Sequence, residues 1–494
     1  MSAEVARGVA FPVGTDGSRS TSKLGRGVVA DALREVDPAG ARAAERETNW
    51  RSGYITHLRR LTEAGLSSSD AALAIARAGL ASTHERMRVI DRHGNDHELT
   101  SSLAAPAARG LSTVSVTGQG EPVTELTIPY RGRRLAGEAL RRQLDTWVAD
   151  GVIEPSCAAA VGHVMANPGW LSLDGTTVIV LGAGAELGPL RALLSWGATV
   201  AGVDLPDAAI WSKVLTAARE RSGTLLVPVA AEAVPDADDH HVADQAGIDL
   251  IAEVAEAADW VVGLPGRPVL GTYAYADGGT HVRVSLASDM VGRRVAAARD
   301  DLALAFLATP TDVFAVPGEA VAHSVRAYEQ RSRRAKLVGR PLRTVSGGRL
   351  LRRNYAPGVD PGICDALVAQ QGPNYALAKR LQRWRAAVAR ADGTPTSLNV
   401  APSTRTRSVV KNRVLAAAYA GAHRFGIEIF EPETSNALMA ALLVHDVQTG
   451  GGPDHDHPWQ DEAHAAAHGG LWRAAYAPRS ALGLATVLGM ASRG

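Results

Sequence analysis

The sequence predicts an α/β protein with a doubly wound parallel sheet, preceded by a mainly helical N-terminal extension. Short stretches of strand-forming residues alternate with helical stretches from residue 171 onward, and strands separated by helices form parallel sheets with right-handed crossovers. The first such stretch runs into a glycine-rich loop, LGAGAELGPL at 181–190. Upstream, between 46 and 170, apolar residues recur at three- and four-residue spacing, which is typical of amphipathic helices.

Composition excludes several classes of protein. The chain has 494 residues, enough for two or more domains, and its 52 basic and 51 acidic residues leave a net charge of +1. So balanced a charge gives no electrostatic footprint for nucleic acid. No apolar stretch reaches the ~18 residues that span a bilayer. Two cysteines and the lack of a signal-like N-terminus predict a cytoplasmic protein. We expect its partner to be a small-molecule substrate.

The chain divides into four predicted parts. Residues 1–45 lack a steady period and predict a loose N-terminal arm. Residues 46–170 predict a mainly helical extension, with a possible hairpin over 112–130. Residues 171–450 predict the sheet domain, with an insertion at about 267–347. Residues 451–494 predict a His-rich loop and a C-terminal helix.

The sheet domain begins with a regular series of elements. We expect strands over 176–181, 199–204 and 223–230, an acidic surface loop over 232–245, a helix over 246–258 and a fourth strand over 259–266. The order implies parallel strands joined by helices.

The glycine loop predicts a dinucleotide-binding, Rossmann-like unit. Gly182 and Gly184 allow a tight turn and close backbone approach to a pyrophosphate, and the following helix offers free N–H groups. We expect the loop residues Gly182, Gly184, Leu187 and Gly188 to bind the cofactor. Asp204, after the second strand, is placed to accept hydrogen bonds from ribose hydroxyls. Its charge favours NAD, although NADP stays open.

A second motif, YALAK, lies on a predicted helix that begins near residue 372. Tyr375 and Lys379 are four residues apart, so their side chains share one face of the helix. An ammonium beside a phenol favours the phenolate and lowers the pKa of the tyrosine, which makes it a usable general acid or base. An exposed Tyr and Lys on an amphipathic helix is the plainer alternative.

Taken in order, these motifs resemble the short-chain dehydrogenase/reductase family. The matching features are LGAGAELG, Asp204, VVGLPG at 261–266, YALAK and NVAPS at 399–403, and the resemblance covers about 176–450. It implies hydride transfer between a nicotinamide and a carbonyl or alcohol carbon. Tyr375 would pass the proton, and Lys379 would lower its pKa and bind the nicotinamide ribose. Further cofactor contacts are implied for Gly263, Pro402 and Thr404.

The sequence departs from the family pattern at several positions. Glu186 replaces a glycine of the loop and would place a carboxylate near a pyrophosphate, and Ser403 replaces the glycine of a P-G turn. The catalytic serine of the family ends the strand before the tyrosine helix. We assign that strand to GRLLRRNY at 348–355, which puts Asn354 or Tyr355 in the serine position.

Two other classes of function stay open. A non-catalytic Rossmann protein, binding a nucleotide or acting as a scaffold, would explain Glu186 and the missing serine. A methyltransferase would share the glycine loop but leave YALAK unexplained. The histidines at 455, 457, 464 and 468 predict a polar surface loop, with a metal site as the alternative. We expect no metal, and we expect a homo-oligomer.

Overall fold

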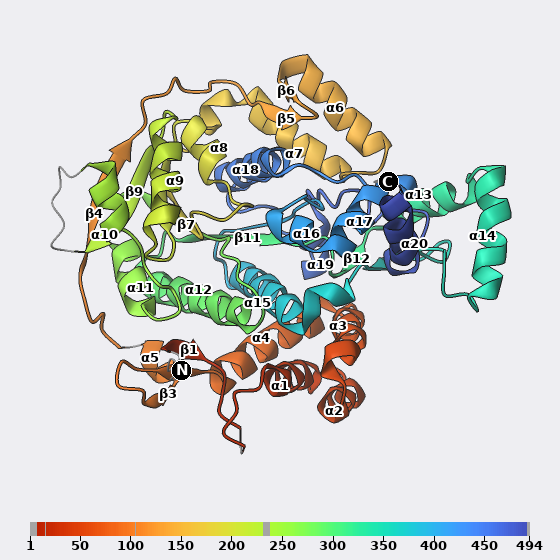
Figure 1. Ribbon diagram of the computed structural model, residues 1–494, viewed down its shortest axis with the longest axis horizontal. Coiled ribbons are helices and arrows are strands. Elements are labelled where there is room, and N and C mark those ends of the chain that lie inside the picture. The colour runs from red at the N-terminus through yellow and green to blue at the C-terminus, as the bar shows by residue number, and fades with distance from the viewer. Residues whose placement is uncertain (1–6, 15, 104, 231–237, 492–494) are drawn as a thin grey trace.

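A seven-stranded sheet runs through the middle of the molecule (Figure 1), in a computed structural model that describes residues 7–14, 16–103, 105–230 and 238–491. The strand order is β14-β11-β10-β7-β8-β9-β4. The strands are β4 (Leu111–Thr117), β7 (Thr176–Leu181), β8 (Thr199–Val203), β9 (Thr224–Ala230), β10 (Arg267–Thr272), β11 (Ala303–Ala308) and β14 (Thr396–Val400).

Six of these strands are parallel, and only β4 runs antiparallel, beside β9 at the edge of the sheet. The six follow the order of doubly wound, dinucleotide-binding sheets, with β7 in the middle. The order reverses at β7, which pairs with β8 on one side and β10 on the other. The predicted α/β class is confirmed, and the order is consistent with a Rossmann-like fold.

The parallel strands are apolar on both faces, because helices cover both. Along β7, Ile179 and Leu181 belong to one buried cluster, whereas Val178 and Val180 belong to another. Successive side chains of a strand point to opposite faces, so the sheet separates two cores.

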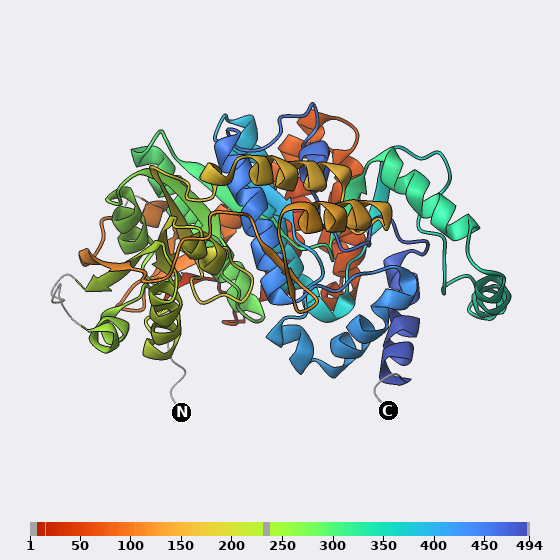
Figure 2. The same cartoon turned by 90° about the horizontal axis from the view of Figure 1, so that it is seen from above.

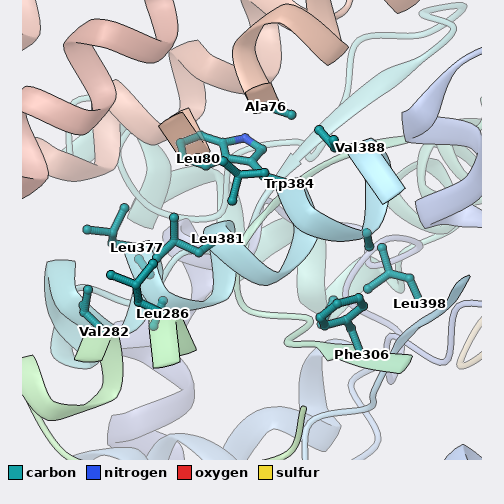
Figure 3. Packing of buried hydrophobic residues seen from close by; sticks show 14 of the residues in the cluster. Ala76, Leu80, Val282, Leu286, Phe306, Leu377, Leu381, Trp384, Val388 and Leu398 are labelled. Atoms are coloured by element: carbon teal, nitrogen blue, oxygen red, sulfur yellow. The ribbon is translucent and has the colours of Figure 1, made fainter. Parts of the chain in front are cut away.

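Three helices cover the first face: α11 (Val254–Val262), α12 (Gly279–Ala298) and α15 (Gly372–Ala391). Helices from the N-terminal part lie over them, namely α1 (Thr21–Leu33), α3 (Trp50–Gly65) and α4 (Ser69–Arg86). Figure 3 shows Trp384 of α15 beside Ala76 and Leu80 of α4. A Cβ added to Gly79 would lie 2.3 Å from the Trp384 ring, so a glycine is needed where α4 meets this tryptophan.

Helices from both halves of the chain cover the second face. Blue α18 crosses and contacts gold α7 (Figure 2), and α6 lies further out (Figure 1). These helices are α6 (Gly137–Ala149), α7 (Pro155–Ala166), α8 (Leu190–Ser195), α9 (Ala208–Arg219) and α18 (Pro432–Gln448), with a 3-10 turn η1 (Pro168–Trp170). The sheet is therefore sandwiched between elements that come from all parts of the sequence.

The prediction of a loose N-terminal arm does not hold for residues 21–46. They form α1 and α2 (Pro38–Arg46), and Leu24, Val28 and Leu33 of α1 are buried. Gly, Ser and Arg dilute the apolar pattern there, which hides the helical period. A small antiparallel sheet, β1 (Gly8–Ala10), β2 (Arg88–Ile90) and β3 (Asp96–Glu98), and the short α5 (Leu99–Leu103) complete this region.

The expected hairpin over 112–130 is wrong. Its first half is β4, which joins the central sheet beside β9. Its second half contains β5 (Ile128–Tyr130), which pairs with β6 (Arg133–Leu135) instead. The alternating pattern correctly predicted strands, but alternation does not say which strands pair.

The fourth predicted strand is also wrong, because residues 259–262 are the end of α11. A short apolar run does not distinguish a strand from a buried helix. The helix expected over 246–258 begins only at Val254. Within the loop expected over 232–245, residues 232–237 lie outside the described residues, and α10 (Asp239–Gln245) follows them.

The insertion lies later in the chain than 267–347. Residues 267–308 form β10, α12 and β11, which all belong to the sheet domain. The excursion from the sheet separates β11 from α15 and contains β12 (Val313–Val316), α13 (Gly318–Glu329), α14 (Arg333–Val345), β13 (Gly362–Asp365) and a 3-10 turn η2 (Ala369–Gln371). Strands β12 and β13 pair only with each other, and α14 lies at the far edge of the molecule (Figure 1). Residues 348–355 form no strand, apart from a single bridge between Arg353 and Tyr476.

The chain ends in a group of helices beside the carboxyl edge of the sheet. They are α16 (Arg407–Lys411), α17 (Arg413–Ala422), a 3-10 turn η3 (His423–Phe425), α19 (Pro458–Ala463) and α20 (Pro478–Ala491). The predicted C-terminal helix is thus present. Among the described residues, no helix is both long enough and apolar enough to cross a membrane.

Candidate functional site

The glycine loop follows β7 at the point where the strand order reverses. Gly182 has a φ of +98°, and a Cβ there would lie 2.7 Å from the backbone of Ala274, which follows β10. A Cβ on Gly184 would lie 2.8 Å from Ile210. Both glycines are therefore required by close packing inside this chain. The loop occupies the crevice where doubly wound sheets bind their ligands.

Asp204 lies directly after β8 and faces the loop. Its Oδ2 accepts a hydrogen bond from the Gly184 N–H at 2.7 Å, and its Oδ1 accepts one from the Leu205 N–H at 2.8 Å. Burial raises the pKa of Asp204, and these two hydrogen bonds act in the opposite direction. Each carboxylate oxygen can accept a further hydrogen bond, so Asp204 keeps the capacity to bind a hydroxyl group.

The Glu186 side chain points away from its own loop. Its Oε2 accepts a hydrogen bond from the N–H of Arg407 at 2.8 Å, and its backbone oxygen accepts one from Asn436 Nδ2 at 2.9 Å. Glu186 thus joins the glycine loop to the segment that follows β14. Within the described residues, the N–H groups of Glu186, Leu187 and Gly188 have no hydrogen-bond partner.

Tyr375 lies in the first turn of α15, with the Thr309 hydroxyl nearby. Burial raises the pKa of Tyr375, and the nearby Thr309 hydroxyl acts against this rise. The expected lowering of this pKa by Lys379 is not observed. Tyr375 is therefore protonated at neutral pH.

Lys379 lies one turn further along α15. Its Nζ donates to the Leu307 oxygen of β11 at 3.2 Å and to Gln382 Oε1 at 3.1 Å. Burial lowers the pKa of Lys379 to about 8. The ammonium is thus fixed at the carboxyl end of β11, two residues before Thr309.

Thr309 is the residue that the sequence analysis missed. It follows β11 directly, and β11 is the last strand of the central sheet before the tyrosine helix. Thr309 therefore stands where the family resemblance expects a serine. Its Oγ1 is 2.9 Å from Oγ1 of Thr311, which accepts a hydrogen bond from Gln371 Nε2 at 2.7 Å. The signal was present in ALAFLATPT, an apolar run followed by two threonines.

His281 forms the wall of the site on the other side of Tyr375. The two rings are stacked, with centroids 5.4 Å apart and planes 12° apart, and Tyr275 contacts both rings. Burial, with a smaller effect of the Lys379 charge, lowers the pKa of His281 to about 3. The Ala276 N–H donates to Nδ1, so the neutral ring carries its proton on Nε2. That atom is buried and has no partner among the described residues.

Three of the predicted site residues lie elsewhere or are already bonded. Asn354 Nδ2 faces the backbone oxygen of Ala474 at 3.3 Å, and Tyr355 donates to the oxygen of Trp472 at 2.8 Å. Neither contacts Tyr375, because residues 348–355 are outside the sheet. Gly263 ends α11 and precedes β10, so it lies at the amino edge of the sheet, opposite the glycine loop.

The segment after β14 borders the site. The Thr404 hydroxyl donates to the oxygen of Pro402 at 2.9 Å and is 2.6 Å from the Ser435 hydroxyl, so it is not free to donate to a ligand. Ser403 lies close to Tyr419, and burial raises the pKa of Tyr419 to about 12. Thr311, Ser403 and Tyr419 line one part of a mostly apolar cavity of about 80 Å³.

The histidines of the tail do not come together. His455 Nε2 is 3.4 Å from His464 Nδ1, whereas His468 pairs with the buried Glu154 at 2.9 Å. His457 Nε2 is 3.2 Å from the Gly65 oxygen. Helix α19 ends at Ala463, so His464 and His468 do not share a helix face. Within the described ranges, no group of three His, Cys, Asp or Glu residues could hold a metal ion.

Comparison with known proteins gives one distant similarity. No family model and no curated protein matches the chain. Among solved structures, the chain is similar to a thiolation-reductase di-domain from an archaeal non-ribosomal peptide synthetase, at 11% identity and a TM-score of 0.27. The match covers 51% of this chain and 48% of that chain, about half of each.

Proposed function

We propose that the chain is an NAD(P)-dependent oxidoreductase of the short-chain dehydrogenase/reductase type, which transfers a hydride between a nicotinamide and a carbonyl or alcohol carbon. The closeness of the Tyr375 and Thr309 hydroxyls is the observation that carries the proposal. A hydroxyl of the YALAK helix lies next to a hydroxyl at the end of the preceding sheet strand. Both lie at the carboxyl edge of the sheet, as does the glycine loop.

The chain's residues fit a dinucleotide. The free N–H groups of Glu186, Leu187 and Gly188 suit a pyrophosphate, since backbone donors before a helix form anion sites. Asp204 would accept the ribose hydroxyls, and its charge favours NAD over NADP because it repels a 2′-phosphate. When bound, the nicotinamide supplies or accepts the hydride.

Protein side chains would manage the proton. In the direction of reduction, the Tyr375 hydroxyl donates its proton to the carbonyl oxygen, and Thr309 donates a hydrogen bond that polarises this carbonyl. Lys379 lies one turn further along the same helix and would bind the nicotinamide ribose. The neutral ring of His281 packs on Tyr375 and limits the directions in which its hydroxyl can point.

Substitution of Tyr375 by Phe tests this mechanism. We expect kcat to fall by about 100-fold or more, the typical contribution of a general acid, while the Kd for NADH stays unchanged. Tyr130→Phe is the matched control, because Tyr130 packs in the core on the other face and bonds Glu428. Turnover of a carbonyl panel that is equal in wild type and Tyr375→Phe contradicts the proposed mechanism.

A non-catalytic nucleotide-binding protein or a scaffold is the second candidate function. The contact between Glu186 and Arg407 favours it, because this contact bridges the two segments that would lie on either side of a pyrophosphate. Calorimetry with NADH and NADPH distinguishes the possibilities. Binding without turnover of any carbonyl or alcohol supports a nucleotide sensor, and no binding of either cofactor supports a scaffold.

Self-association and a cytoplasmic location remain predictions, as does the division of the chain into four parts apart from the arm and the insertion corrected above. Sedimentation of the purified full chain tests the first. Helices α17 and α20 carry the exposed apolar side chains Val414, Val487 and Met490. If the chain sediments as a dimer, we propose to test these positions as its interface by replacing one of them with a charged residue.

A further inference from the structure

The cavity lined by Thr311, Ser403 and Tyr419 has a neighbouring pocket of opposite character. The first cavity is mostly apolar, and its walls include Leu367, Ile427 and Leu482. The second pocket, of about 230 Å³, is polar. Arg479 lines both, and the chain passes from one lining to the other at Asp365–Ala366 and at Ala477–Pro478. The two pockets are therefore neighbours.

Arginines dominate the second pocket. Its lining holds four guanidinium groups, those of Arg59, Arg352, Arg353 and Arg479, and one carboxylate, that of Asp365. They come from α3, from the excursion and from the start of α20. Arginine is suited to oxyanions, because its planar fork donates two parallel hydrogen bonds to a carboxylate or a phosphate.

Acidic partners satisfy only part of this charge. Arg479 donates to Asp365 at 2.9 Å, Arg59 donates to Glu63 at 2.7 Å, and Arg353 donates to Glu329. Arg352 makes no ion pair with any residue that the structure describes. The Nε of Arg353 is buried and has no partner among these residues. An oxyanion would pair with both groups.

The surrounding chain adds positive charge. From residue 326 to residue 353 the sequence has ten Arg or Lys residues and a single acid, Glu329. The excursion from the sheet is thus strongly basic, although the whole chain is nearly neutral, and two of its arginines, Arg352 and Arg353, line the pocket. Such a local field raises the concentration of anions at the pocket and speeds their capture.

We infer that the substrate is an apolar carbonyl or alcohol compound with an oxyanion head, a phosphate or a carboxylate. This inference rests on the proposed function, because it takes Tyr375 as the reacting end. The apolar part lies in the cavity next to Thr311, Ser403 and Tyr419. The oxyanion lies in the arginine pocket and binds Arg352 and Arg353.

Calorimetry with hexyl phosphate and heptanoate tests the arginine pocket without any turnover. We expect wild type to bind at least one of them, and Arg352→Gln to weaken that binding by at least tenfold. Arg349→Gln is the matched control, since Arg349 is three residues away, carries the same charge and does not line the pocket. The tighter of the two ligands identifies the head group. Equal loss in both variants, or no binding to wild type, overturns the inference.

Kinetics with three aldehydes then separates this inference from the proposed function. We compare hexanal with its 6-phosphate and 6-carboxylate derivatives, using NADH. At least one anionic aldehyde should exceed hexanal in kcat/KM by tenfold or more, and Arg352→Gln should remove this preference. Reduction without any anionic preference overturns the inference and leaves the proposed function intact. Hexyl phosphate binding without reduction of any aldehyde leaves the pocket intact and counts against the proposed function.

Discussion

Glu186 is the residue on which cofactor binding depends most. Its carboxylate accepts a hydrogen bond from Arg407, and the N–H groups of Glu186, Leu187 and Gly188 have no partner in the part of the chain that the structure describes. A dinucleotide still has to place its negative pyrophosphate near this charge. At a separation of about 4 Å in a water-like medium, two unit charges repel by about 1 kcal/mol.

We therefore expect Glu186→Gln to bind NADH about fivefold more tightly than wild type, as measured by calorimetry at low salt. The amide keeps a hydrogen-bond acceptor for Arg407 and removes the charge. Glu220→Gln, on an exposed acid at the end of α9, should leave the affinity unchanged. Weaker binding in Glu186→Gln would mean that the carboxylate stabilises the binding form of the loop.

Lys379 gives a pH-dependent prediction. Its pKa falls from 10.5 to about 8 on folding, because burial disfavours the ammonium. Between these two values the unfolded chain binds more protons than the folded chain, so stability rises with pH in this window. Below pH 8 the folded state carries the full cost of burying the ammonium. A pKa shift of this size corresponds to about 3 kcal/mol of unfolding free energy.

The measurement is urea unfolding of wild type and Lys379→Met between pH 7 and pH 10. We expect the variant to be the more stable protein at pH 7 and its advantage to shrink as the pH rises above 8. A difference in unfolding free energy that does not change with pH would contradict a buried, titrating ammonium.

The sequence predicted the residues whose motifs are local. Gly182, Gly184 and Asp204 lie together because a strand, a loop and a strand suffice to position them. Tyr375 and Lys379 share a helix face. Thr309 was missed because the partner of Tyr375 is fixed by strand order, which the motif does not contain. His281 gives no signal at all, since a lone histidine in an apolar helix is usually a core residue.

At the scale of elements, α17 and α20 approach each other more closely than side chains normally allow. A Cβ on Gly421 would lie 2.0 Å from the oxygen of Ala485, and a Cβ on Gly489 would lie 1.8 Å from the oxygen of Ala417. Helix α20 also lines the apolar cavity through Leu482 and Ala485. The width of the cavity therefore depends on these two glycines.

Gly489→Ala should destabilise the protein by about 1–3 kcal/mol, the usual cost of overpacking. Gly483→Ala on the same helix is the control. A Cβ at position 483 would have no atom within 4 Å. The higher helix propensity of alanine should therefore stabilise the protein by up to about 1 kcal/mol. Thermal unfolding measures both, and equal effects would contradict the close approach of the helices.

The elements were predictable where a strand or helix has its own pattern. Strands β7, β8 and β9 match the predicted 176–181, 199–204 and 223–230 almost residue for residue. Strands β10 and β11 were missed because RPVLGT contains a proline and a glycine and ALAFLA has no β-branched residue. That error displaced the insertion and moved the serine position to Asn354.

At the scale of the whole molecule, the N-terminal helices belong to the sheet body. A buried cluster joins them: Asp289 of α12 bonds His84 of α4 at 2.6 Å and Arg385 Nη2 of α15 at 3.0 Å. An exposed pair, Arg77 with Asp392, joins α4 to the end of α15 as well. Removal of one partner from a buried charge cluster leaves an uncompensated charge.

Asp289→Asn should therefore lower the free energy of unfolding by about 3–5 kcal/mol. Asp392→Asn should change it by less than about 1 kcal/mol, because the exposed pair is screened by solvent. Chemical unfolding of the full chain measures both. If the two variants are equally stable, the buried cluster does not hold the N-terminal helices in place.

The excursion between β11 and α15 separates Thr311 from its hydrogen-bond partner Gln371 by 60 residues along the chain. Polymer statistics make this long path inexpensive, since each doubling of a loop costs about 0.6 kcal/mol in closure entropy. Mutation and recombination can therefore lengthen, shorten or replace the excursion while the reacting hydroxyls stay where the sheet holds them. Because two of the four arginines of the second pocket, Arg352 and Arg353, lie on this excursion, new substrate preferences can evolve there independently of the chemistry.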